Sequence, residues 1–558
     1  MRKAIFTRLF FISFIIFTGI IDSSAQQCIW AKSAGGDYTA SPYAIATDAS
    51  GNVYVGGSYN SDSMIFGTTS IINPFNSTQN MFIAKYDSLG NVQWAKTFGN
   101  GGPDGIDGLT VDAFGNLYAT ASIGSPVITI GTTTINNPTG NALALIKLTS
   151  SGAVTWVRSA EGVGGTSPDG IGNLATDLSG NIFIVGSFTG SLVFGSVGIE
   201  NFNTVGAETY LVKYDPLGNV LWAKQSHTGG YVGFDEAGVV ATDRSGNVYI
   251  TGGFGSDTMY FDSLSITNPI PVTTSMIFLA KYDPSGNPVW AKSAGDSGVS
   301  QANSLAIDDS GSIYITGSFE SPQLIIGSIT LNNADAVLGT DDIFLAKYSA
   351  GGIPVWAARA GGTDGDYPAQ IVLDGAGYLY ITGQFLSSSL SFGTTTLSNS
   401  GIFLAKYTAA EGDPVMAKES LVADANSWAA PLAKDNFGHI YVAGAFDSPI
   451  KLDSIALSDS AAPNYDIFLA KYGYLPSGIA TVNMVGHDFN IYPNPTNNRI
   501  IISGTDNITN VTIFNVSGQT VYDQGHNATM VQINIAYLPA GMYFVKVNGT
   551  TAMRFEKE

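Results

Sequence analysis

The sequence is poor in cysteine, histidine and charged side chains. Its 558 residues include one Cys and four His, which excludes an intramolecular disulfide framework and CxxC-type metal sites. None of the His has the spacing of a zinc motif. Charged residues make up 12% of the chain, roughly half of the ~25% usual in globular proteins. The 24 basic and 44 acidic residues leave a net charge of −20, which argues against a nucleic-acid partner because phosphate binding needs clustered Lys and Arg.

What the chain has instead is 44% hydrophobic residues and 66 Gly, a composition of folded rather than disordered protein. Its longest apolar run, Leu9 to Ile21, follows three basic residues and precedes small residues ending at Ala25. This order predicts a secretory signal peptide over residues 1–25, cleaved after Ala25. Cleavage would remove three basic residues and one acid, which changes the net charge to −22.

Two other interpretations of this N-terminus fit less well. The apolar run has 13 residues, whereas a membrane span needs ~17–25. A lipoprotein signal at Cys28 would need small residues before the cysteine, where two Gln stand. No later segment is long and apolar enough to cross a bilayer, so we expect no transmembrane span in the mature chain.

A short sequence motif, here called a word, recurs seven times, about every 65 residues. It consists of Asp-x-x-Gly followed by an alternating, aromatic-rich run. Its leading residues are Asp48, Asp112, Asp177, Asp243, Asp308, Asp374 and Asp435. Two further words, of the types LAKY and WAK, recur with the same period. The alternation predicts four β-strands per repeat. The Gly provides the positive φ that the turn needs, and the Asp caps the turn.

The chain ends decide how the repeats are joined. The first WAK word, at Trp30, has no earlier strands of its repeat, and the last repeat has no WAK word after Lys471. The N-terminal strand therefore fits the vacant place in the last repeat. This predicts an all-β fold, a seven-bladed β-propeller over residues 26–472 closed by that strand. An open solenoid would need capping repeats. Extra residues between the second and third strands predict a short strand or hairpin at the rim of each blade.

The repeats resemble the bacterial β-propeller repeat family defined by the word D-x-x-G-N-x-Y-V-x-G. The resemblance covers about 80% of the chain. It implies a propeller fold and a secreted setting, but no single activity.

The pattern changes after a predicted linker at residues 473–488. Residues 489–558 contain five or six short strands with turn words, which predicts a small β-sandwich. They resemble the type A sorting domain of the type IX secretion system. The matching residues are Tyr492, Pro493, Asn494, Pro495, Gly518, Leu538, Pro539, Gly541 and Tyr543.

This resemblance implies a route and two partners. The signal peptide would take the chain through the inner membrane, and the type IX secretion machinery would export it across the outer membrane. Its sortase would remove the domain, and the protein would be secreted or attached to the outer surface. An ordinary terminal sandwich is the alternative.

Candidate ligand-binding residues lie in the long loops that precede the first strand of each repeat. Four acids share one register there, eight residues before the turn Asp: Asp104, Asp169, Asp235 and Asp366. Binding residues concentrate on loops held by a rigid scaffold, so this long-loop face is the candidate binding face. Converging acids could hold Ca²⁺, but we favour the alternative that each acid accepts hydrogen bonds from its own loop. We expect no other metal, and we assign no cofactor and no catalytic residue.

The sequence leaves three functions open. The favoured one is a non-enzymatic exported propeller that binds an extracellular macromolecule, a glycan or a protein. The second is an enzyme that degrades extracellular polysaccharide or peptide with paired acids such as Asp364 and Asp366, or Asp235 and Glu236. The third is a structural surface component. An enzyme should break the repeat symmetry with a unique polar cluster, and no such cluster is evident in the sequence.

Overall fold

The chain folds into two compact units, Met1–Leu475 and Pro476–Glu558, here called the repeat unit and the C-terminal unit. The boundary falls inside the predicted linker. The structure is a computed structural model, and it describes residues 26–75, 78–137, 142–163, 168–201, 206–229, 233, 235–270, 274–422, 428–458, 464–473, 489–515, 520–539, 541–548 and 551–557. All regular elements in these ranges are β-strands. Within this part of the chain, no helix is long and apolar enough to cross a membrane.

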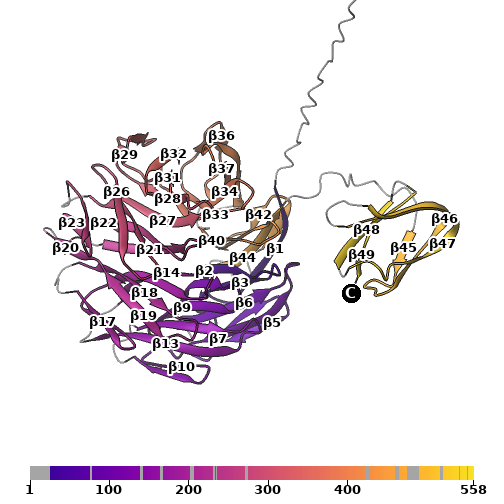
Figure 1. The fold of residues 1–558 in the computed structure, drawn as a ribbon, viewed down its shortest axis with the longest axis horizontal. Coiled ribbons are helices and arrows are strands. Elements are labelled where there is room, and N and C mark those ends of the chain that lie inside the picture. The colour runs from indigo at the N-terminus through magenta and orange to yellow at the C-terminus, as the bar shows by residue number, and fades with distance from the viewer. Residues whose placement is uncertain are drawn as a thin grey trace, which may run out of the picture. The chain divides into compact units, whose positions relative to one another are not determined.

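The repeat unit contains seven antiparallel sets of four strands, called sheets 1 to 7 (Figure 1). Sheets 1 to 3 contain β2 (Ala40–Thr47), β3 (Val53–Tyr59), β6 (Asn80–Tyr86) and β7 (Val92–Phe98); β8 (Asp104–Val111), β9 (Leu117–Ile123), β12 (Ala142–Leu148) and β13 (Val154–Val163); and β14 (Pro168–Thr176), β15 (Ile182–Phe188), β18 (Glu208–Tyr214) and β19 (Val220–Gln225). Sheets 4 and 5 contain β21 (Asp235–Thr242), β22 (Val248–Phe254), β25 (Met276–Tyr282) and β26 (Pro288–Ala294); and β27 (Ser300–Ile307), β28 (Ile313–Phe319), β31 (Asp342–Tyr348) and β32 (Pro354–Gly361). Sheets 6 and 7 contain β33 (Asp366–Leu373), β34 (Tyr378–Phe385), β37 (Gly401–Thr408) and β38 (Pro414–Glu419); and β40 (Trp428–Lys434), β41 (Ile440–Phe446), β44 (Asp466–Gly473) and β1 (Gln27–Gly35).

The N-terminal strand β1 is the fourth strand of sheet 7. It pairs antiparallel with β44, and Trp30 lies opposite Lys471. The same words pair inside sheet 1, where Trp94 lies opposite Lys85. The expectation that the orphan strand completes the last repeat is therefore met by this pairing.

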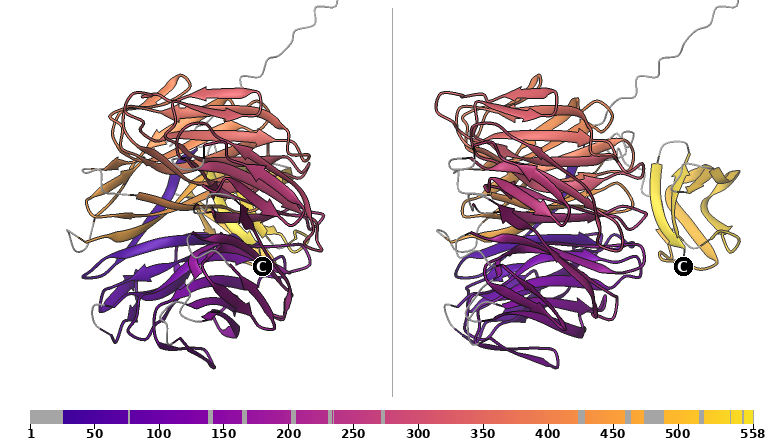
Figure 2. Two further views of the ribbon diagram at one scale, coloured as in Figure 1. Left: turned by 90° about the vertical axis from the view of Figure 1, so that its left-hand side faces the viewer. Right: turned by 60° about the vertical axis from the view of Figure 1, so that its left-hand side comes forward.

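The first strands of the seven sheets contact one another in a closed circle. Each contacts the first strand of the next sheet, and β40 of sheet 7 contacts β2 of sheet 1. Figure 1 shows these strands gathered in the middle of the repeat unit, and Figure 2 shows its sheets from two further sides. One face of the unit carries the short turns between first and second strands, and the opposite face carries the long loops.

A two-stranded hairpin follows the second strand of every sheet. The hairpins are β4–β5 (Ser63–Phe66, Thr69–Ile72), β10–β11 (Val127–Ile130, Thr133–Asn136), β16–β17 (Ser191–Phe194, Val197–Glu200), β23–β24 (Thr258–Phe261, Leu264–Thr267), β29–β30 (Gln323–Ile326, Ile329–Asn332), β35–β36 (Leu390–Phe392, Thr395–Leu397) and β42–β43 (Ile450–Leu452, Ile455–Leu457). Five of them pair with a strand of the preceding sheet: β4 with β1, β16 with β13, β35 with β32, and β23 and β42 with the short extensions β20 (His227–Gly229) and β39 (Leu421–Val422). A rim hairpin was expected, and its pairing with the neighbouring sheet adds hydrogen bonds between sheets.

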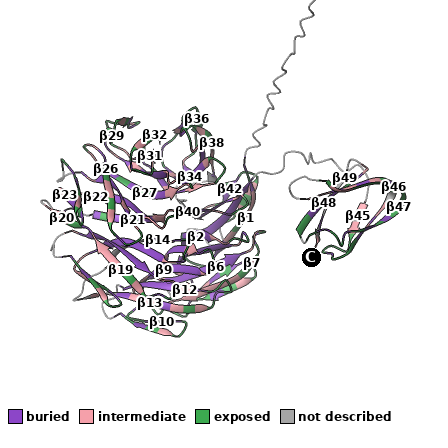
Figure 3. Cartoon of the chain, in the orientation of Figure 1, coloured by how far each residue is buried: buried purple, intermediate pink, exposed green. Residues whose placement is uncertain are grey.

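The hydrophobic core lies between neighbouring sheets. Ile83 of sheet 1 packs with Ile106 and Ala119 of sheet 2 in one buried cluster. Sheets 7 and 1 share a cluster of the same kind, which combines Leu469 with Phe82. Figure 3 shows this burial along the strands of the unit. Since a fully buried aliphatic or aromatic side chain contributes ~1.5–3 kcal/mol, these shared clusters tie each sheet to the next.

A polar network repeats at the short-turn face. At sheet 7 the Asp435 carboxylate accepts hydrogen bonds from the backbone N–H of His439 at 3.0 Å and from the Tyr441 hydroxyl at 3.0 Å. Burial raises the pKa of Asp435, but the hydrogen bonds from His439 and Phe437, together with the charge of His439, outweigh it and hold the pKa below its ordinary value. Gly438, which closes the turn, has φ +81°, as the turn word predicts.

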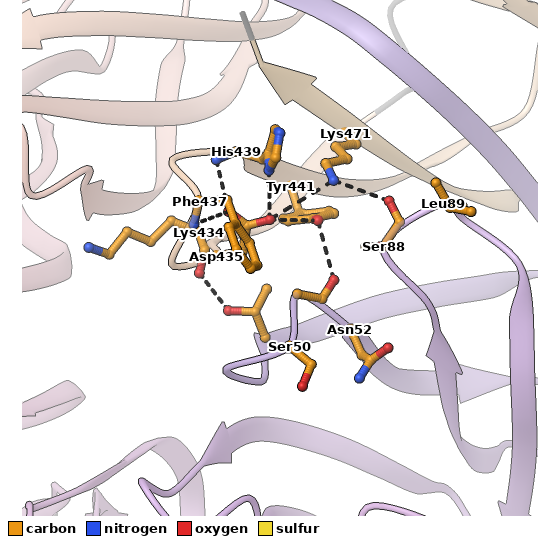
Figure 4. A network of polar contacts seen from close by, with 12 residues as sticks. Ser50, Asn52, Ser88, Leu89, Lys434, Asp435, Phe437, His439, Tyr441 and Lys471 are labelled. Atoms are coloured by element: carbon orange, nitrogen blue, oxygen red, sulfur yellow. Dashed lines mark hydrogen bonds and ion pairs between the residues drawn. The ribbon is translucent and has the colours of Figure 1, made fainter. Parts of the chain in front are cut away.

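The same network joins the sheets. The Lys471 ammonium donates to the carbonyl oxygen of Ser88 in sheet 1 at 3.1 Å (Figure 4). The Trp30 indole N–H donates to the same oxygen at 3.2 Å. Between sheets 1 and 2, Lys85 and Trp94 make the equivalent pair of bonds to the Ser150 carbonyl, both at 3.1 Å. The repeated Lys is therefore structural, with its stem buried and its charge held by the next sheet.

The C-terminal unit contains five strands: β45 (Phe489–Tyr492), β46 (Arg499–Asn515), β47 (Thr520–Asn534), β48 (Gly541–Val547) and β49 (Thr551–Lys557). They pair in the order β45-β46-β48-β49, and β47 also pairs with β46. Along β48 the buried Tyr543, Val545 and Val547 alternate with more exposed residues, which is the period-2 pattern of a strand with one face on a core.

Candidate functional site

The long-loop acids lie at the starts of first strands, and the three whose side chains are described are each hydrogen-bonded within their own sheet. Asp104 begins β8, and its carboxylate accepts the Ser125 hydroxyl at 2.6 Å and the backbone N–H of Ser125 at 2.9 Å. Asp235 accepts the Ser256 hydroxyl at 2.9 Å, and Asp366 accepts the Ser387 hydroxyl at 2.9 Å. All three acids are fully buried.

This geometry matches the favoured interpretation for these three acids, namely local hydrogen bonding. The structure places them in sheets 2, 4 and 6 and does not bring them together. Asp169 lies in β14, but its side chain falls outside the described residues. Among the described side chains, no group of three or more His, Cys, Asp or Glu residues is placed to hold a metal ion. Calcium binding by the four acids stays an untested prediction.

Burial dominates the electrostatics of these carboxyl groups. It raises the pKa of Asp235 to about 6, although the Ser256 hydrogen bonds act in the opposite direction. It raises the pKa of Asp366 to about 7, and the nearby charge of Asp342 adds to the effect. The pKa of Asp104 is also raised by burial.

The acid pairs considered for catalysis are not equivalent in exposure. Asp235 is buried, whereas Glu236 is exposed on the opposite face of β21. Asp366 is buried, whereas Asp364 is exposed. Glycosidases of the two-carboxylate type need both groups beside one substrate bond, and neither pair presents two accessible carboxylates on one side.

A cavity of about 220 Å³ lies where the seven first strands meet, and every one of these strands contributes to its lining. Each first strand has a β-bulge near its middle, for example at Tyr43, Asp107 and Asn173. A bulge re-aims side chains and is often found beside functional sites. The bulge residues also differ from sheet to sheet, while most flanking positions are small or aliphatic, with Gln370 of β33 as an exception.

Sequence reasoning missed this cavity. Its polar lining residues are Tyr43, Asp107, Thr110, Asn173, Ser304 and Gln370. The sequence signal that could have revealed the cavity is variation within the repeat. In an otherwise regular repeat, the residue in the middle of the first strand changes from Tyr to Asp, Asn, Gly or Ala.

The residues that resemble a sorting domain divide into buried and exposed groups. Leu538 and Tyr543 are buried in the core of the C-terminal unit, and the Tyr543 hydroxyl donates to the Pro539 carbonyl at 2.8 Å. Gly541 begins β48. The run from Tyr492 to Pro495 is exposed. Gly518 lies outside the described residues.

Residues 490–557 match the family described as secretion system C-terminal sorting domain. The sorting domain indicates export to the cell surface or secretion, and it implies handling by the type IX secretion machinery.

Other similar proteins share less of their sequence or length with this chain. An uncharacterized WD repeat-containing protein of Acanthamoeba polyphaga mimivirus is 26% identical over 366 residues, which are 55% of this chain and 26% of that protein. The chain thus spans about a quarter of that relative's length. Among solved structures, Sqt1 from Chaetomium thermophilum aligns with a TM-score of 0.40 and 11% identity, covering 75% of this chain and 97% of that one. PorZ, a surface component of the type IX secretion system of Porphyromonas gingivalis, aligns with a TM-score of 0.22 and 12% identity, covering 96% and 86%.

Proposed function

We propose that the chain is an exported, non-enzymatic binding scaffold that acts at the outer cell surface or in the medium. Residues 26–472 form a seven-bladed propeller in which sheets 1 to 7 are the blades. Residues 489–558 form a small sandwich that directs export. The match of residues 490–557 to the sorting domain is the observation that carries the export half of this proposal.

The closed ring is supported by the contacts between sheets 7 and 1. Lys471 and Trp30 bond to Ser88 in the same way that Lys85 and Trp94 bond to Ser150. Closure gives every sheet a neighbour on both sides, so that only short, protected strand edges remain. A rigid, secreted ring with variable loops on one face suits the presentation of binding residues.

The scaffold is favoured over an enzyme because the loop-face acids are occupied by neighbouring Ser and backbone N–H groups. The same Asp–Ser hydrogen bond recurs in sheets 2, 4 and 6, which is typical of a structural role. Fold alone implies no activity.

The proposed route begins with the signal peptide. Residues 1–25, including Ala25, lie outside the described residues, so cleavage there remains a prediction. The type IX machinery and its sortase are the proposed partners in export, and an extracellular glycan or protein is the proposed ligand.

Two parallel assays on the exported chain test this function. Extracellular polysaccharides and outer-surface proteins are immobilised, and retention of the chain is measured. The same substrates are incubated with the chain and analysed for cleavage products. Saturable retention without cleavage supports the scaffold. Cleavage above that of a boiled control would overturn it, as would the absence of retention on every surface.

A further inference from the structure

The central cavity differs chemically from the rest of the repeat unit. Many of the repeated polar groups elsewhere are hydrogen-bonded within the fold, as in the Asp435 network. The cavity instead gathers polar groups that differ between sheets: one carboxyl, two side-chain amides, two aliphatic hydroxyls and one phenol.

The hydrogen bonds already made there determine what the lining can offer a ligand. The Gln370 Oε1 atom accepts the backbone N–H of Leu432 at 2.7 Å, and the Asn173 Oδ1 atom accepts that of Leu174 at 2.8 Å. Because each amide oxygen is used, the amide nitrogen is the group that remains to donate. The Ser304 hydroxyl accepts the N–H of Ile371 at 3.0 Å and likewise keeps its proton to donate.

Asp107 supplies the one carboxyl group. Its Oδ2 atom accepts the Ser122 hydroxyl at 2.8 Å. Burial raises the pKa of Asp107 to about 7, against the effect of that hydrogen bond. Among the described residues that line the cavity there is no Lys, Arg or His to compensate an anionic ligand, and the chain's net charge of −20 opposes one further.

An aromatic ring completes the lining. Tyr43 is 46% exposed although it lies in the middle of a first strand. An exposed ring beside a few fixed hydrogen-bonding groups is the usual composition of a small-molecule site. The volume of about 220 Å³ is below the ~300–1,000 Å³ of sites for drug-sized ligands, which limits the ligand to one ring.

We propose that this cavity binds a single neutral sugar ring, whose hydroxyl groups bond to Asn173, Gln370 and Asp107 and whose apolar face packs on Tyr43. This inference rests on the proposed binding function and specifies its ligand class. The occupant is a free monosaccharide or the terminal residue of a glycan. These two sources share the same chemistry and are separated by the experiment.

The test measures binding of single sugars to the whole exported chain. Ligand-observed NMR is recorded with glucose, galactose, mannose, xylose and N-acetylglucosamine, with methylamine and acetate as cationic and anionic comparisons. Gln370→Glu keeps the oxygen that accepts from Leu432 but replaces the donating NH₂ group. Tyr43→Leu removes the exposed ring. Gln323→Glu, on an exposed rim hairpin, is the matched control.

We expect at least one sugar to bind, with its Kd raised tenfold or more by Gln370→Glu and by Tyr43→Leu, and unchanged within twofold by Gln323→Glu. Circular dichroism of each variant verifies folding. Binding of methylamine or acetate in preference to every sugar would overturn the proposal. So would the absence of sugar binding up to about 10 mM, or a Kd that neither cavity variant changes.

The failure of this proposal can be told apart from failure of the scaffold. If a polysaccharide or surface protein is retained equally by the wild type and both cavity variants, the scaffold stands and the cavity is not its site. If the variants lose both the monosaccharide and a polysaccharide, the cavity holds a glycan end. If they lose only the monosaccharide, the ligand is the free sugar.

Discussion

Replacing Lys471 with Met tests whether sheet 7 is joined to sheet 1 as firmly as any other pair of sheets. The Lys471 side chain is buried, its ammonium donates to Ser88, and it lies 5.2 Å from the Tyr441 ring centroid. Met keeps the apolar stem and removes the charge. Lys85→Met makes the same change between sheets 1 and 2, where the ammonium donates to Ser150.

The magnitude follows from these contacts. A hydrogen bond from a charged group contributes ~1.5–3 kcal/mol, and a cation–π contact adds ~0.5–2 kcal/mol. The loss lies at the lower end because Trp30 still donates to the Ser88 carbonyl and Tyr441 still donates to Asp435. We therefore expect each variant to lose about 2 kcal/mol.

Urea unfolding of the whole chain, followed by Trp fluorescence, measures the two losses side by side. A closed ring predicts equal shifts of the unfolding midpoint for Lys471→Met and Lys85→Met. If Lys85→Met is destabilised while Lys471→Met stays within about 0.5 kcal/mol of wild type, the contact across the ring closure contributes nothing, and the closed ring is refuted.

Three further changes have definite expected results. Tyr210 replaces the Phe of five other sheets, and its buried hydroxyl has no hydrogen-bond partner among the described residues. Tyr210→Phe should thus raise stability by about 1 kcal/mol in urea unfolding, and a loss would mean that the hydroxyl is satisfied. The folded-state pKa of Asp366 is raised to about 7 from 3.8. Its protonated form therefore contributes fully to the free energy of unfolding below pH 3.8, and this contribution is lost as the pH rises through 7. Asp366→Asn should therefore be more stable relative to wild type at pH 8 than at pH 5 in thermal melts, and an equal difference at both pH values would contradict the raised pKa. Deleting Cys28–Lys32 removes much of the β1–β44 ladder and should cost about 3 kcal/mol or more, whereas an unchanged melting temperature would argue against closure by this strand.

The repeat words made the strands and the closing pair predictable. Because the Trp and Lys words recur with one period, the sequence alone pairs the unmatched Trp30 with Lys471. The turn was predictable in the same way. The turn that begins at Asp435 needs a positive φ at its fourth residue, and Gly438 adopts one without a Cβ clash.

Partners distant in sequence were harder to foresee. The shared register of Asp104, Asp235 and Asp366 is visible in the sequence, whereas nothing beside each acid marks its Ser partner. Each Ser lies 21 residues downstream of its acid, so a second register in the same repeats would have found them. The pairing of a hairpin whose strands have only three or four residues depends on which sheet lies beside it, and this information is not local to the hairpin.

The cavity was missed for a different reason. Sequence reasoning looked for sites in the loops, where the acids repeat. The residues in the middle of the first strands vary between repeats, but no single repeat marks them as site residues, because Asp107 and Gln370 each stand alone in an ordinary strand pattern. Only the circular arrangement of the seven strands brings them to one place.

The central claim is that this chain is a scaffold exported by its sorting domain, and removal of that domain tests it most directly. The chain and a version lacking residues 489–558 are expressed in a bacterium with type IX secretion, and each is quantified in periplasm, on the surface and in the medium. The account predicts that the complete chain reaches the surface or medium, while the shortened chain accumulates folded in the periplasm. Equal export of both versions would contradict it.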